Sequence, residues 1–402
     1  MSMRFWTLAC IALAGTPAVA ADNAERQTGN SGRSFVVQPV ATFNFPWRIA
    51  ALPNGSLLVT EKPGRLFRVT PTGAKQQIGG VPKVYYGGQQ GLLDVVPSPR
   101  FARDRTIYLT YAEPSAGGTG LALARAELVG NALRGVRVIW RQVPPGKGGQ
   151  LGGIITFDPS GTSLFLAVGE RQRFTPAQDP DQATGKILRL TLDGKPAPGN
   201  PMAGKLGADT VTVIDPPEDS AAAQTVAGRK VRLARPNLSP SEMWSMGHRN
   251  PTGLAFDARG ALWSIEMGPR GGDELNLIKP GKNYGWPLVS NGINYNGVPI
   301  PRPDTRPELE RPVVSWTPVI SPGGLTFYAG RLFPAWRGSA FTGGLSSRAL
   351  VRIAFDGRGN AREAERWDMG QRIRDVEVTP DGALWVIEDR QNGRLLRVTP
   401  RK

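Results

Sequence analysis

Arginine and amide side chains adjoin each other within residues 244–253 (WSMGHRNPTG), a stretch rich in turn-forming residues. Arg249 supplies a planar guanidinium fork and Asn250 an amide, and both groups can bind the oxygens of an anionic small molecule. This combination makes the stretch a candidate binding site. His248 is the only histidine of the chain. Because it directly precedes Arg249, and neighbours in such a turn should point apart, we expect it to be structural.

Glycines and carboxylates follow in residues 266–274 (EMGPRGGDE), ahead of the aromatic stretch 281–287 (GKNYGWP). Oxygen ligands on a bent backbone suit a hard cation such as calcium. An ordinary solvated turn would also explain Asp273 and Glu274. The spacing alone therefore leaves a metal site and a plain turn open.

Two arginines, Arg372 and Arg374, lie two positions apart within residues 371–375 (QRIRD). In an extended segment alternate side chains point to the same side, so the two guanidinium groups should face one ligand. Two such forks suit carboxylate or phosphate. Paired surface arginines without any function would give the same pattern.

Two glycine-rich stretches, residues 87–94 (GGQQGLLD) and 148–153 (GGQLGG), each carry an embedded amide, Gln89 and Gln150. Neither is a nucleotide-binding P-loop, because no Gly-Lys-Ser/Thr follows. A turn without function is the alternative interpretation of both.

A turn followed by a strand recurs along the chain and would position these stretches. Residues 260–266 (GALWSIE) return as residues 382–388 (GALWVIE), and more loosely as residues 55–61 and 161–170. Each copy begins at the glycine of a β-turn sequence, where a positive φ is favoured. A second strand that alternates apolar with basic or hydroxylic residues follows in residues 64–71, 185–192 and 393–400. This period of two predicts half-buried antiparallel strands.

The gaps between the four copies leave room for two more units. Candidate strands lie at residues 105–111 and at residues 339–345 with 349–353. The predicted fold class is therefore all-β, a six-bladed β-propeller, with seven blades as the alternative count. Residues 21–402 would form this single domain, and the weakly periodic residues 203–240 would be an inserted loop over one face. Loops between blades converge at the mouth of the channel, which would bring together the candidate binding stretches described above.

The first 20 residues have the pattern of a signal peptide. Arg4 precedes an apolar run, and an A-x-A cleavage motif ends at Ala20. Cleavage there would remove Cys10, the only cysteine, so we expect no disulfide or thiolate chemistry. A better cleavage site follows Cys10, which disfavours a lipoprotein anchor there. No other apolar run approaches the roughly 20 residues of a membrane span, so we expect a soluble protein, periplasmic or secreted.

The formal net charge is +16, yet the basic residues are scattered rather than clustered. Without lysine runs or an RNA-binding signature, and with export expected, nucleic acid is not the predicted partner. An anionic small molecule or simple colloidal solubility explains the charge better.

Four of these stretches, taken in order, resemble the soluble pyrroloquinoline quinone (PQQ)-dependent sugar dehydrogenases, the glucose/sorbosone and aldose sugar dehydrogenase family. The resemblance runs from about Pro46 to the C-terminus. Its most specific parts are residues 88–94 (GQQGLLD), 247–251 (GHRNP), 268–274 (GPRGGDE) with 283–286 (NYGW), and 371–376 (QRIRDV). The family is a six-bladed propeller, in agreement with the repeat count.

The resemblance implies a site for PQQ, which carries three carboxylates and an ortho-quinone. The positions it implies around the quinone are Gln89, Arg249, Asn250, Tyr295, Gly344, Leu345, Ser346, Arg372 and Arg374. It also implies one calcium ion at the quinone, held partly by the Gly268 and Pro269 carbonyls. A second, structural calcium would use Glu274 and Tyr284.

The chain departs from the family at several positions. The resemblance places a proton-accepting histidine where Gln150 stands, and an arginine after it where Ile154 stands. A glutamine side chain does not titrate near neutrality and cannot act as a general base. A cofactor-contacting lysine is replaced by Ser346, and a glutamine that often follows Arg-Asn-Pro is replaced by Thr252.

Three functions remain open from the sequence. The first is a PQQ-dependent oxidoreductase that oxidises an aldose sugar or related alcohol and passes electrons to an unknown acceptor. The second is a non-catalytic propeller that binds PQQ or sugar. The third, a calcium-dependent lactonase-like hydrolase, lacks a clear set of carboxylates. Substitute bases for Gln150 would be Glu170, Glu266 or Asp94, although nothing in the sequence places them at the sugar.

Overall fold

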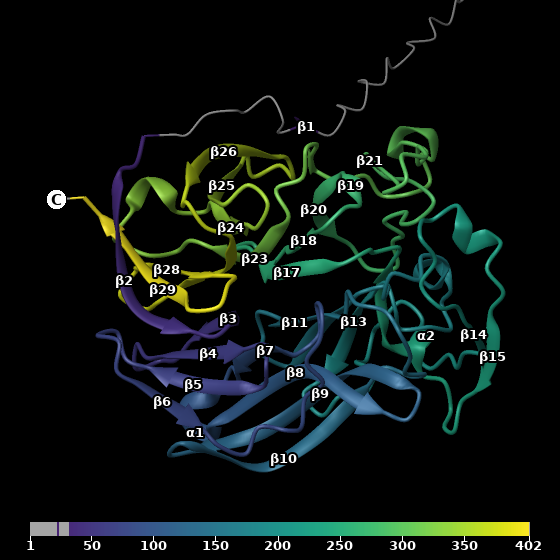
Figure 1. Ribbon diagram of the computed structural model, residues 1–402, viewed down its shortest axis with the longest axis horizontal. Coiled ribbons are helices and arrows are strands. Elements are labelled where there is room, and N and C mark those ends of the chain that lie inside the picture. The colour runs from purple at the N-terminus through teal and green to yellow at the C-terminus, as the bar shows by residue number, and fades with distance from the viewer. Residues whose placement is uncertain (1–21, 24–31, 402) are drawn as a thin grey trace, which may run out of the picture.

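Six antiparallel sheets of four strands, one of them extended by a short parallel fifth strand, surround a central axis in the computed structural model, which describes residues 22–23 and 32–401 (Figure 1). Each sheet is one blade, and in five of them successive strands run outward from the axis in chain order. The predicted six-bladed β-propeller is therefore confirmed. The predicted signal peptide lies outside the described residues.

From inner to outer strand, the first blade consists of β3 (Pro46–Ala51), β4 (Leu57–Glu61), β5 (Arg65–Val69) and β6 (Lys75–Ile78). The second consists of β7 (Leu92–Pro97), β8 (Thr106–Ser115), β9 (Gly118–Val129) and β10 (Ala132–Arg141). The third consists of β11 (Gly152–Phe157), β12 (Ser163–Val168), β13 (Lys186–Thr191) and β16 (Met243–Met246). The fourth blade consists of β17 (Pro251–Phe256), β18 (Leu262–Glu266), β20 (Asp273–Ile278) and β22 (Val314–Trp316). The fifth consists of β23 (Pro322–Phe327), β24 (Ala340–Gly344), β25 (Ala349–Phe355) and β26 (Ala361–Asp368). The sixth consists of β27 (Ile373–Val378), β28 (Leu384–Glu388), β29 (Gly393–Pro400) and β2 (Phe35–Phe43).

The remaining elements are short. They are β1 (Asp22–Asn23), which pairs with β22; the strand pairs β14 (Thr210–Val213) with β15 (Arg229–Arg232) and β19 (Arg270–Gly271) with β21 (Gly292–Ile293); the helices α1 (Phe101–Asp104) and α2 (Ser239–Glu242); and the 3₁₀ turns η2 (Thr175–Gln178), η3 (Ala222–Gln224), η4 (Pro303–Thr305) and η5 (Pro334–Trp336).

The four repeated turn-and-strand copies form the second strands β4, β12, β18 and β28, which are buried along their whole length. The turn glycines have the positive φ that the repeats predict, for example 79° at Gly55 and 86° at Gly382. The matching tryptophans of β18 and β28 are buried, and the indole of Trp385 donates to Thr379 Oγ1 of the preceding turn at 2.9 Å. Each turn thus fixes the strand that follows it, and both faces of that strand pack against neighbouring blades.

The inner strands form a closed ring in which β3 contacts β7, followed by β11, β17, β23 and β27, which returns to β3. The last blade joins the beginning and the end of the continuous range 32–401, because β2 pairs with β29 from Phe35 opposite Pro400 to Phe43 opposite Gly393. Figure 1 shows purple β2 beside yellow β29. An N-terminal strand therefore closes the ring.

A buried ion network joins neighbouring inner strands of the ring. Arg48 of β3 contacts Asp94 of β7 through Nε and Asp375 of β27 through Nη1, both at 3.0 Å. The other carboxylate oxygens accept from backbone amides, Asp375 from Ile49 at 2.7 Å and Asp94 from Ile155 at 2.7 Å. These bonds satisfy the buried charges and fix four inner strands relative to one another.

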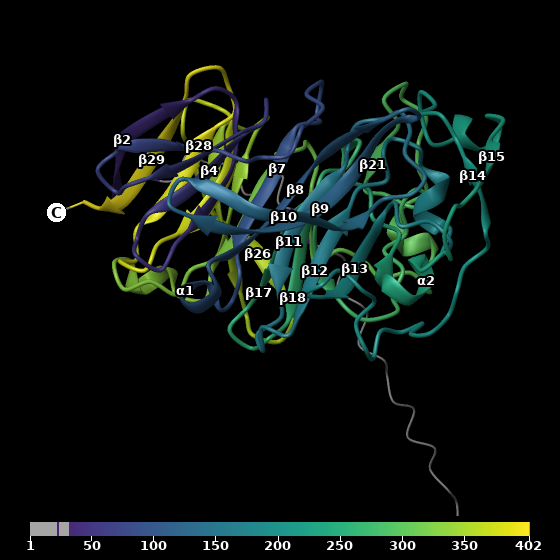
Figure 2. The same cartoon turned by 90° about the horizontal axis from the view of Figure 1, so that it is seen from below.

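Residues 203–240 lie in sequence between the third and fourth strands of their blade and include the β14–β15 pair. This pair lies at the periphery of the molecule in both views (Figures 1 and 2). Each of its strands has only four residues, which is too short for a clear period in the sequence.

Candidate active site

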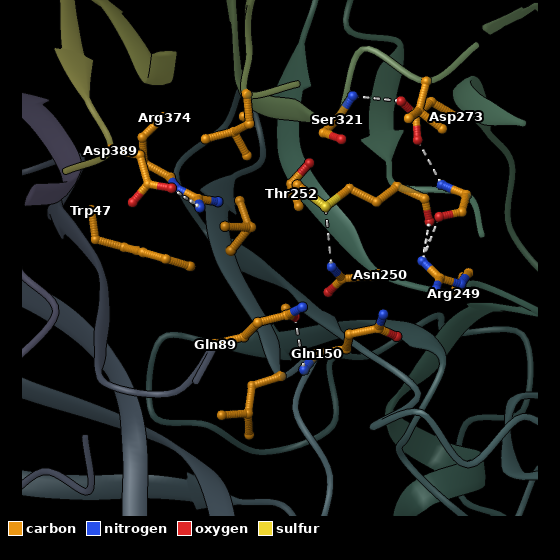
Figure 3. Close-up of a pocket in the computed structure, with 18 of the residues that line it drawn as sticks. Trp47, Gln89, Gln150, Arg249, Asn250, Thr252, Asp273, Ser321, Arg374 and Asp389 are labelled. Carbon is orange, nitrogen blue, oxygen red and sulfur yellow. Dashed lines mark hydrogen bonds and ion pairs between the residues drawn. The ribbon is translucent and has the colours of Figure 1, made fainter. Parts of the chain in front are cut away.

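A cavity of about 530 Å³ opens where segments of all six blades converge, and Figure 3 shows the side chains around it. Six basic and two acidic residues line it: Arg48, Lys62, Arg249, Arg270, Arg372 and Arg374, with Asp273 and Asp389. The two aspartates are outnumbered, so the lining favours an anionic ligand.

The structure brings most of the predicted site residues to this cavity. Those that line it are Gln89, Gln150, Arg249, Asn250, Gly268, Pro269, Tyr295, Leu345, Arg372 and Arg374. Gly344 and Ser346 do not line it, although Leu345 between them does. Gly344 has no side chain, and the Ser346 hydroxyl donates instead to the Val319 carbonyl at 3.0 Å. Glu274 and Tyr284 lie around a separate small cavity.

Arg372 and Arg374 face the cavity together, as their spacing predicts. Both donate to Asp389 Oδ2, at 3.0 and 2.8 Å respectively. The Arg374 guanidinium also lies 3.9 Å from the ring centroid of Trp47 (Figure 3). The two arginines hold the pKa of Asp389 below its usual range despite its burial, and burial lowers the pKa of Arg374. One carboxylate therefore serves two guanidinium groups.

Arg249 lies on the opposite wall and donates through Nη1 to the carbonyls of Met267 at 3.0 Å and Gly268 at 2.6 Å. Its guanidinium also lies 5.2 Å from the Trp286 ring centroid, and its Nη2 donates to the Tyr295 hydroxyl at 3.2 Å. Its buried Nε, like that of Arg374, has no acceptor among the described residues. Buried N–H groups without acceptors are costly, and an oxygen-rich ligand would satisfy them.

Asp273 organises the wall beside Arg249. Its Oδ1 accepts from the Gly268 amide at 2.8 Å and its Oδ2 from the Ser321 amide at 2.7 Å (Figure 3). Burial raises its pKa to about 7. Asp273 is therefore a buried cavity residue that ties the fourth blade to the fifth, and the solvated-turn interpretation does not apply to it.

Gln150 lines the cavity and is 4% exposed. With its amide nitrogen facing Glu170, it donates to Oε1 at 2.7 Å and accepts from Arg249 Nη2 at 3.1 Å. Its backbone amide donates to Gln89 Oε1 at 3.3 Å. Gln150 thus links two cavity residues with a buried carboxylate that does not itself line the cavity.

The segment behind Gln150 is strained and tightly held. Gln150, Arg171, Gln172 and Phe174 all have positive φ values, between 49° and 68°. Non-glycine residues in this region are rare and persist where the surroundings impose them. Arg171 is fully buried and donates to the carbonyls of Gly146, Gly148 and Gly149. These bonds fix the loop that carries Gln150.

The three substitute bases differ in position. Asp94 is fully buried in the ion pair with Arg48. Glu266 accepts from Asn276 and faces His248 Nδ1 at 3.0 Å. Glu170 accepts from the backbone amides of Gln172, Arg173 and Phe174, and burial raises its pKa. Of the three, Glu170 is the one bonded to Gln150.

His248 lies behind the cavity wall rather than on it. Its side chain is fully buried, it shares a hydrogen bond with Ser245 Oγ through Nε2 at 2.8 Å, and it stacks on Tyr284 at 4.7 Å between ring centroids. These contacts agree with a structural role.

The residues predicted to hold calcium offer suitable oxygens in two places. At the main cavity, the Gly268 carbonyl already accepts from Arg249, so a cation there would have to displace this bond. The second cavity, of about 10 Å³, has room for about one water-sized particle. Within the described residues, no group of three or more histidine, cysteine or acidic side chains could hold a metal. Main-chain carbonyl oxygens would therefore have to complete the set of calcium ligands at either cavity.

Glu274 and Tyr284 both line the second cavity together with Glu266. Burial and the neighbouring Glu266 raise the pKa of Glu274 to about 8. A cation would stabilise this carboxylate as an anion. The Tyr284 hydroxyl donates to the Leu277 carbonyl at 2.6 Å and accepts from the Lys279 amide at 2.9 Å, which leaves its main-chain carbonyl as the available ligand.

Sequence reasoning missed Trp47, Lys62 and Asp389 as cavity residues. Asp389 directly follows Glu388 at the end of the last repeat copy, and Lys62 directly follows the equivalent Glu61. A comparison of the residues that directly follow the repeat copies could therefore have identified Lys62 and Asp389 as candidate site residues. Trp47 carried no signal.

The insertion contacts the loop that carries Tyr295. Ser220 donates to Asn294 Oδ1 through its hydroxyl at 2.7 Å, and Asn296 donates to Asp219. Tyr295 itself is 60% exposed and lines the cavity. No residue of 203–240 lines the cavity, so the contact is made through this loop.

No helix in residues 22–23 and 32–401 is long and apolar enough to cross a membrane.

A model of the glucose/sorbosone dehydrogenase family matches residues 43–212 and 230–397, so residues 213–229, in the middle of the insertion, fall between the two matches. The chain is 36% identical over 368 residues to the aldose sugar dehydrogenase YliI of Escherichia coli K12, covering 89% of this chain and 90% of that protein.

Two solved structures have the same fold. The soluble aldose sugar dehydrogenase of Escherichia coli in its apo form matches with a TM-score of 0.78 and 35% identity, over 91% of this chain and 100% of that one. The PQQ-bound aldose sugar dehydrogenase of Streptomyces coelicolor matches with a TM-score of 0.67 and 29% identity, over 91% and 98%. The cavity thus lies in a propeller that these sugar dehydrogenases share, and the chain belongs to the glucose/sorbosone dehydrogenase family.

Proposed function

We propose that this protein is a PQQ-dependent oxidoreductase that oxidises an aldose sugar or a related alcohol. The observation that carries the proposal is the cavity at the centre of the six blades, where basic residues outnumber acidic ones. The Nε groups of Arg249 and Arg374 have no acceptor in the part of the chain that the structure describes. A small molecule with several carboxylates matches this lining. The PQQ-bound relative has the same architecture.

The residues of the cavity divide the task of binding such a cofactor. Arg249, Arg372 and Arg374 would oppose its carboxylates, while Gln89 and Asn250 would hydrogen-bond its oxygens. Tyr295 and Leu345 would contact its ring system, with Gly344 and Ser346 behind Leu345. The bound cofactor would supply the ortho-quinone that takes up two electrons from the alcohol.

Calcium is the second part of the proposal. One ion would bind the Gly268 and Pro269 carbonyls, and its arrival would release Arg249 Nη1 from the Gly268 oxygen for use by the cofactor. A second ion would bind Glu274 and the Tyr284 carbonyl. Its support is the raised pKa of Glu274 beside Glu266, a position where a cation lowers the cost of the negative charge.

Gln150 decides between a working enzyme and a binding protein. The resemblance places the proton acceptor of the reaction at this position, and an amide cannot take a proton from the sugar hydroxyl. Glu170, hydrogen-bonded to Gln150, is the nearest group that could act as a base. The amide at position 150 also favours the alternative function, a propeller that binds PQQ or sugar without turnover.

A titration of the purified protein tests these assignments. PQQ is added with and without calcium while its absorbance is followed, and aldoses are then added with an artificial electron acceptor. Binding followed by sugar-dependent reduction would establish a dehydrogenase. Binding without reduction would establish the non-catalytic alternative, and no binding at any calcium concentration would overturn both. An effect of calcium on PQQ affinity would support the ion beside Gly268.

We also propose that the protein acts after export. Its substrate would be a sugar or alcohol, and its electron acceptor is not identified. Detection of the chain without residues 1–20 in a periplasmic or culture fraction would test export, and an intact N-terminus in the cytoplasmic fraction would contradict it.

A further inference from the structure

Lys62 is a cation of the cavity wall that lies outside the sequence motifs from which the site was predicted. It lies in the turn between β4 and β5 and donates from Nζ to the Gly88 carbonyl at 2.9 Å. Its ammonium lies 5.2 Å from the Trp47 ring centroid and 5.6 Å from that of Tyr86. A lysine placed among rings and a carbonyl is held in position before any ligand arrives.

The charges around Lys62 are not balanced. Its charged neighbours are Asp389, Arg374 and Arg372, and both arginines already bind Asp389. Within the described chain, no carboxylate lies within ion-pair distance of Lys62 Nζ, and its hydrogen bond goes to a neutral carbonyl. Burial lowers its pKa, as do the two arginines, while Asp389 raises it. Three cations therefore share one carboxylate on this side of the cavity.

Such an arrangement is stable only at a cost, because like charges in a partly buried site repel each other. An anion that enters the cavity on this side would relieve the repulsion. Lys62 is well placed to contribute because its Nζ is already near the cavity, and because an ammonium has three donors, of which the Gly88 carbonyl uses one.

We propose that Lys62 is a cofactor-binding residue, which acts with Arg372 and Arg374 to bind the carboxylates of PQQ on this side of the cavity. The inference rests on the proposed function and extends it to a residue from the first blade. It also gives a role to a lysine that reaches the cavity while Oδ2 of Asp389 binds the two arginines.

The test compares Lys62→Met and Lys62→Arg with a matched control, Lys75→Met. Lys75 belongs to the same blade, donates to the Thr42 carbonyl at 2.7 Å and lies 4.9 Å from the Phe43 ring centroid, but it does not line the cavity. PQQ binding to each protein is measured by equilibrium dialysis at low and high salt. The melting temperature of each variant checks that it is folded.

We expect Lys62→Met to weaken PQQ binding by about tenfold or more and to reduce its salt dependence, because one cation fewer opposes the carboxylates. Lys62→Arg should retain binding to within about threefold, since it keeps the charge. Lys75→Met should bind as the wild type does.

Wild-type affinity and salt dependence in Lys62→Met would overturn the inference and leave the proposed function intact. An equal loss in Lys62→Met and Lys75→Met would also overturn it, because a general charge effect would then suffice. If the wild-type protein does not bind PQQ, the proposed function fails and this inference fails with it.

Discussion

Gln150 shows how much a single side chain can decide in a cavity that is otherwise complete. Its backbone is held at a φ of 49°, and its side chain is bonded to Glu170 and Arg249. Glu170 in turn has three backbone amide donors that fix its carboxylate. A titratable ring at position 150 would therefore have a carboxylate partner already in place.

We expect Gln150→His to increase sugar oxidation by about 10²–10⁴-fold in the PQQ-loaded protein, because an imidazole bonded to Glu170 can accept the proton that an amide cannot. The measurement is the steady-state rate with an artificial acceptor, as a function of pH. The activity should rise with pH through the pKa of the new histidine, since the neutral ring is the base.

Gln150→Asn is the control, because it keeps an amide and shortens the side chain. It should show no gain in rate. A variant Gln150→His that binds PQQ but oxidises sugar no faster than the wild type would contradict the assignment of this position.

At the scale of elements, each repeat copy ends on a glutamate that is buried and accepts a hydrogen bond from a main-chain amide in its own turn or in a neighbouring segment. Glu61 accepts from the Asn44 amide, Glu266 from the Arg249 amide and Glu388 from the Arg394 amide, while Glu170 accepts from three amides in its own turn. These carboxylates order the loops at the cavity end of the blades. The repeat therefore positions the site as well as building the fold.

Another buried glutamate, Glu242, ends α2 next to the outer strand β10. Glu242 is 7% exposed, and its carboxylate accepts a hydrogen bond from the Trp140 indole at 3.0 Å. Burial raises its pKa from 4.5 to about 7. The folded state thus binds a proton that the unfolded state has lost between about pH 4.5 and 7. This group therefore makes the free energy of unfolding fall as the pH rises through that window, and it has no further effect above it.

We expect Glu242→Gln to gain stability relative to the wild type as the pH is raised from 5 to 8, by up to about 3 kcal/mol. The amide oxygen can still accept from Trp140, and the other titrating groups are common to both proteins. Urea denaturation at several pH values measures the difference. Glu127→Gln, which removes a surface ion pair with Arg105, is the control and should change stability by less than about 0.5 kcal/mol at every pH. A difference for Glu242→Gln that does not vary with pH would contradict the prediction.

The whole molecule depends on the closure of its ring by β2. Phe35 at the start of this strand is 1% exposed and packs edge-on against Trp367 and Trp336, with ring centroids 5.2 and 5.8 Å away. This packing joins the N-terminal strand to the core between the fifth and sixth blades. With the ring closed, the inner strand of each blade contacts the inner strands of the two adjacent blades.

We expect Phe35→Ala to lower the free energy of unfolding by about 3–5 kcal/mol, because it leaves a cavity between the two tryptophans. Val36 is the matched control, since it is 44% exposed on the other side of the same strand. Val36→Ala should cost less than about 0.5 kcal/mol. Equal losses in the two variants, measured by denaturant unfolding, would show that the closure does not depend on this packing.

The sequence by itself determined the number of blades and the neighbourhood of the site. Turn glycines and the two-residue period are local properties, and they were readable at residues 55–61 and 382–388 without any tertiary information. The same-side placement of Arg372 and Arg374 was readable for the same reason. The short β14–β15 pair was not, because four residues are too few to reveal a period.

Only the tertiary structure decided which residues meet. Lys62 of the first blade approaches Arg374 of the last, and Arg48 joins Asp94 and Asp375, because the ring closes and brings segments more than 300 residues apart into contact. The sharing of Asp389 by two arginines, and the position of Glu170 behind Gln150, likewise follow from the packing of neighbouring segments. Local sequence specifies strands and turns, but the charge balance of the cavity depends on distances between blades, which only ring closure sets.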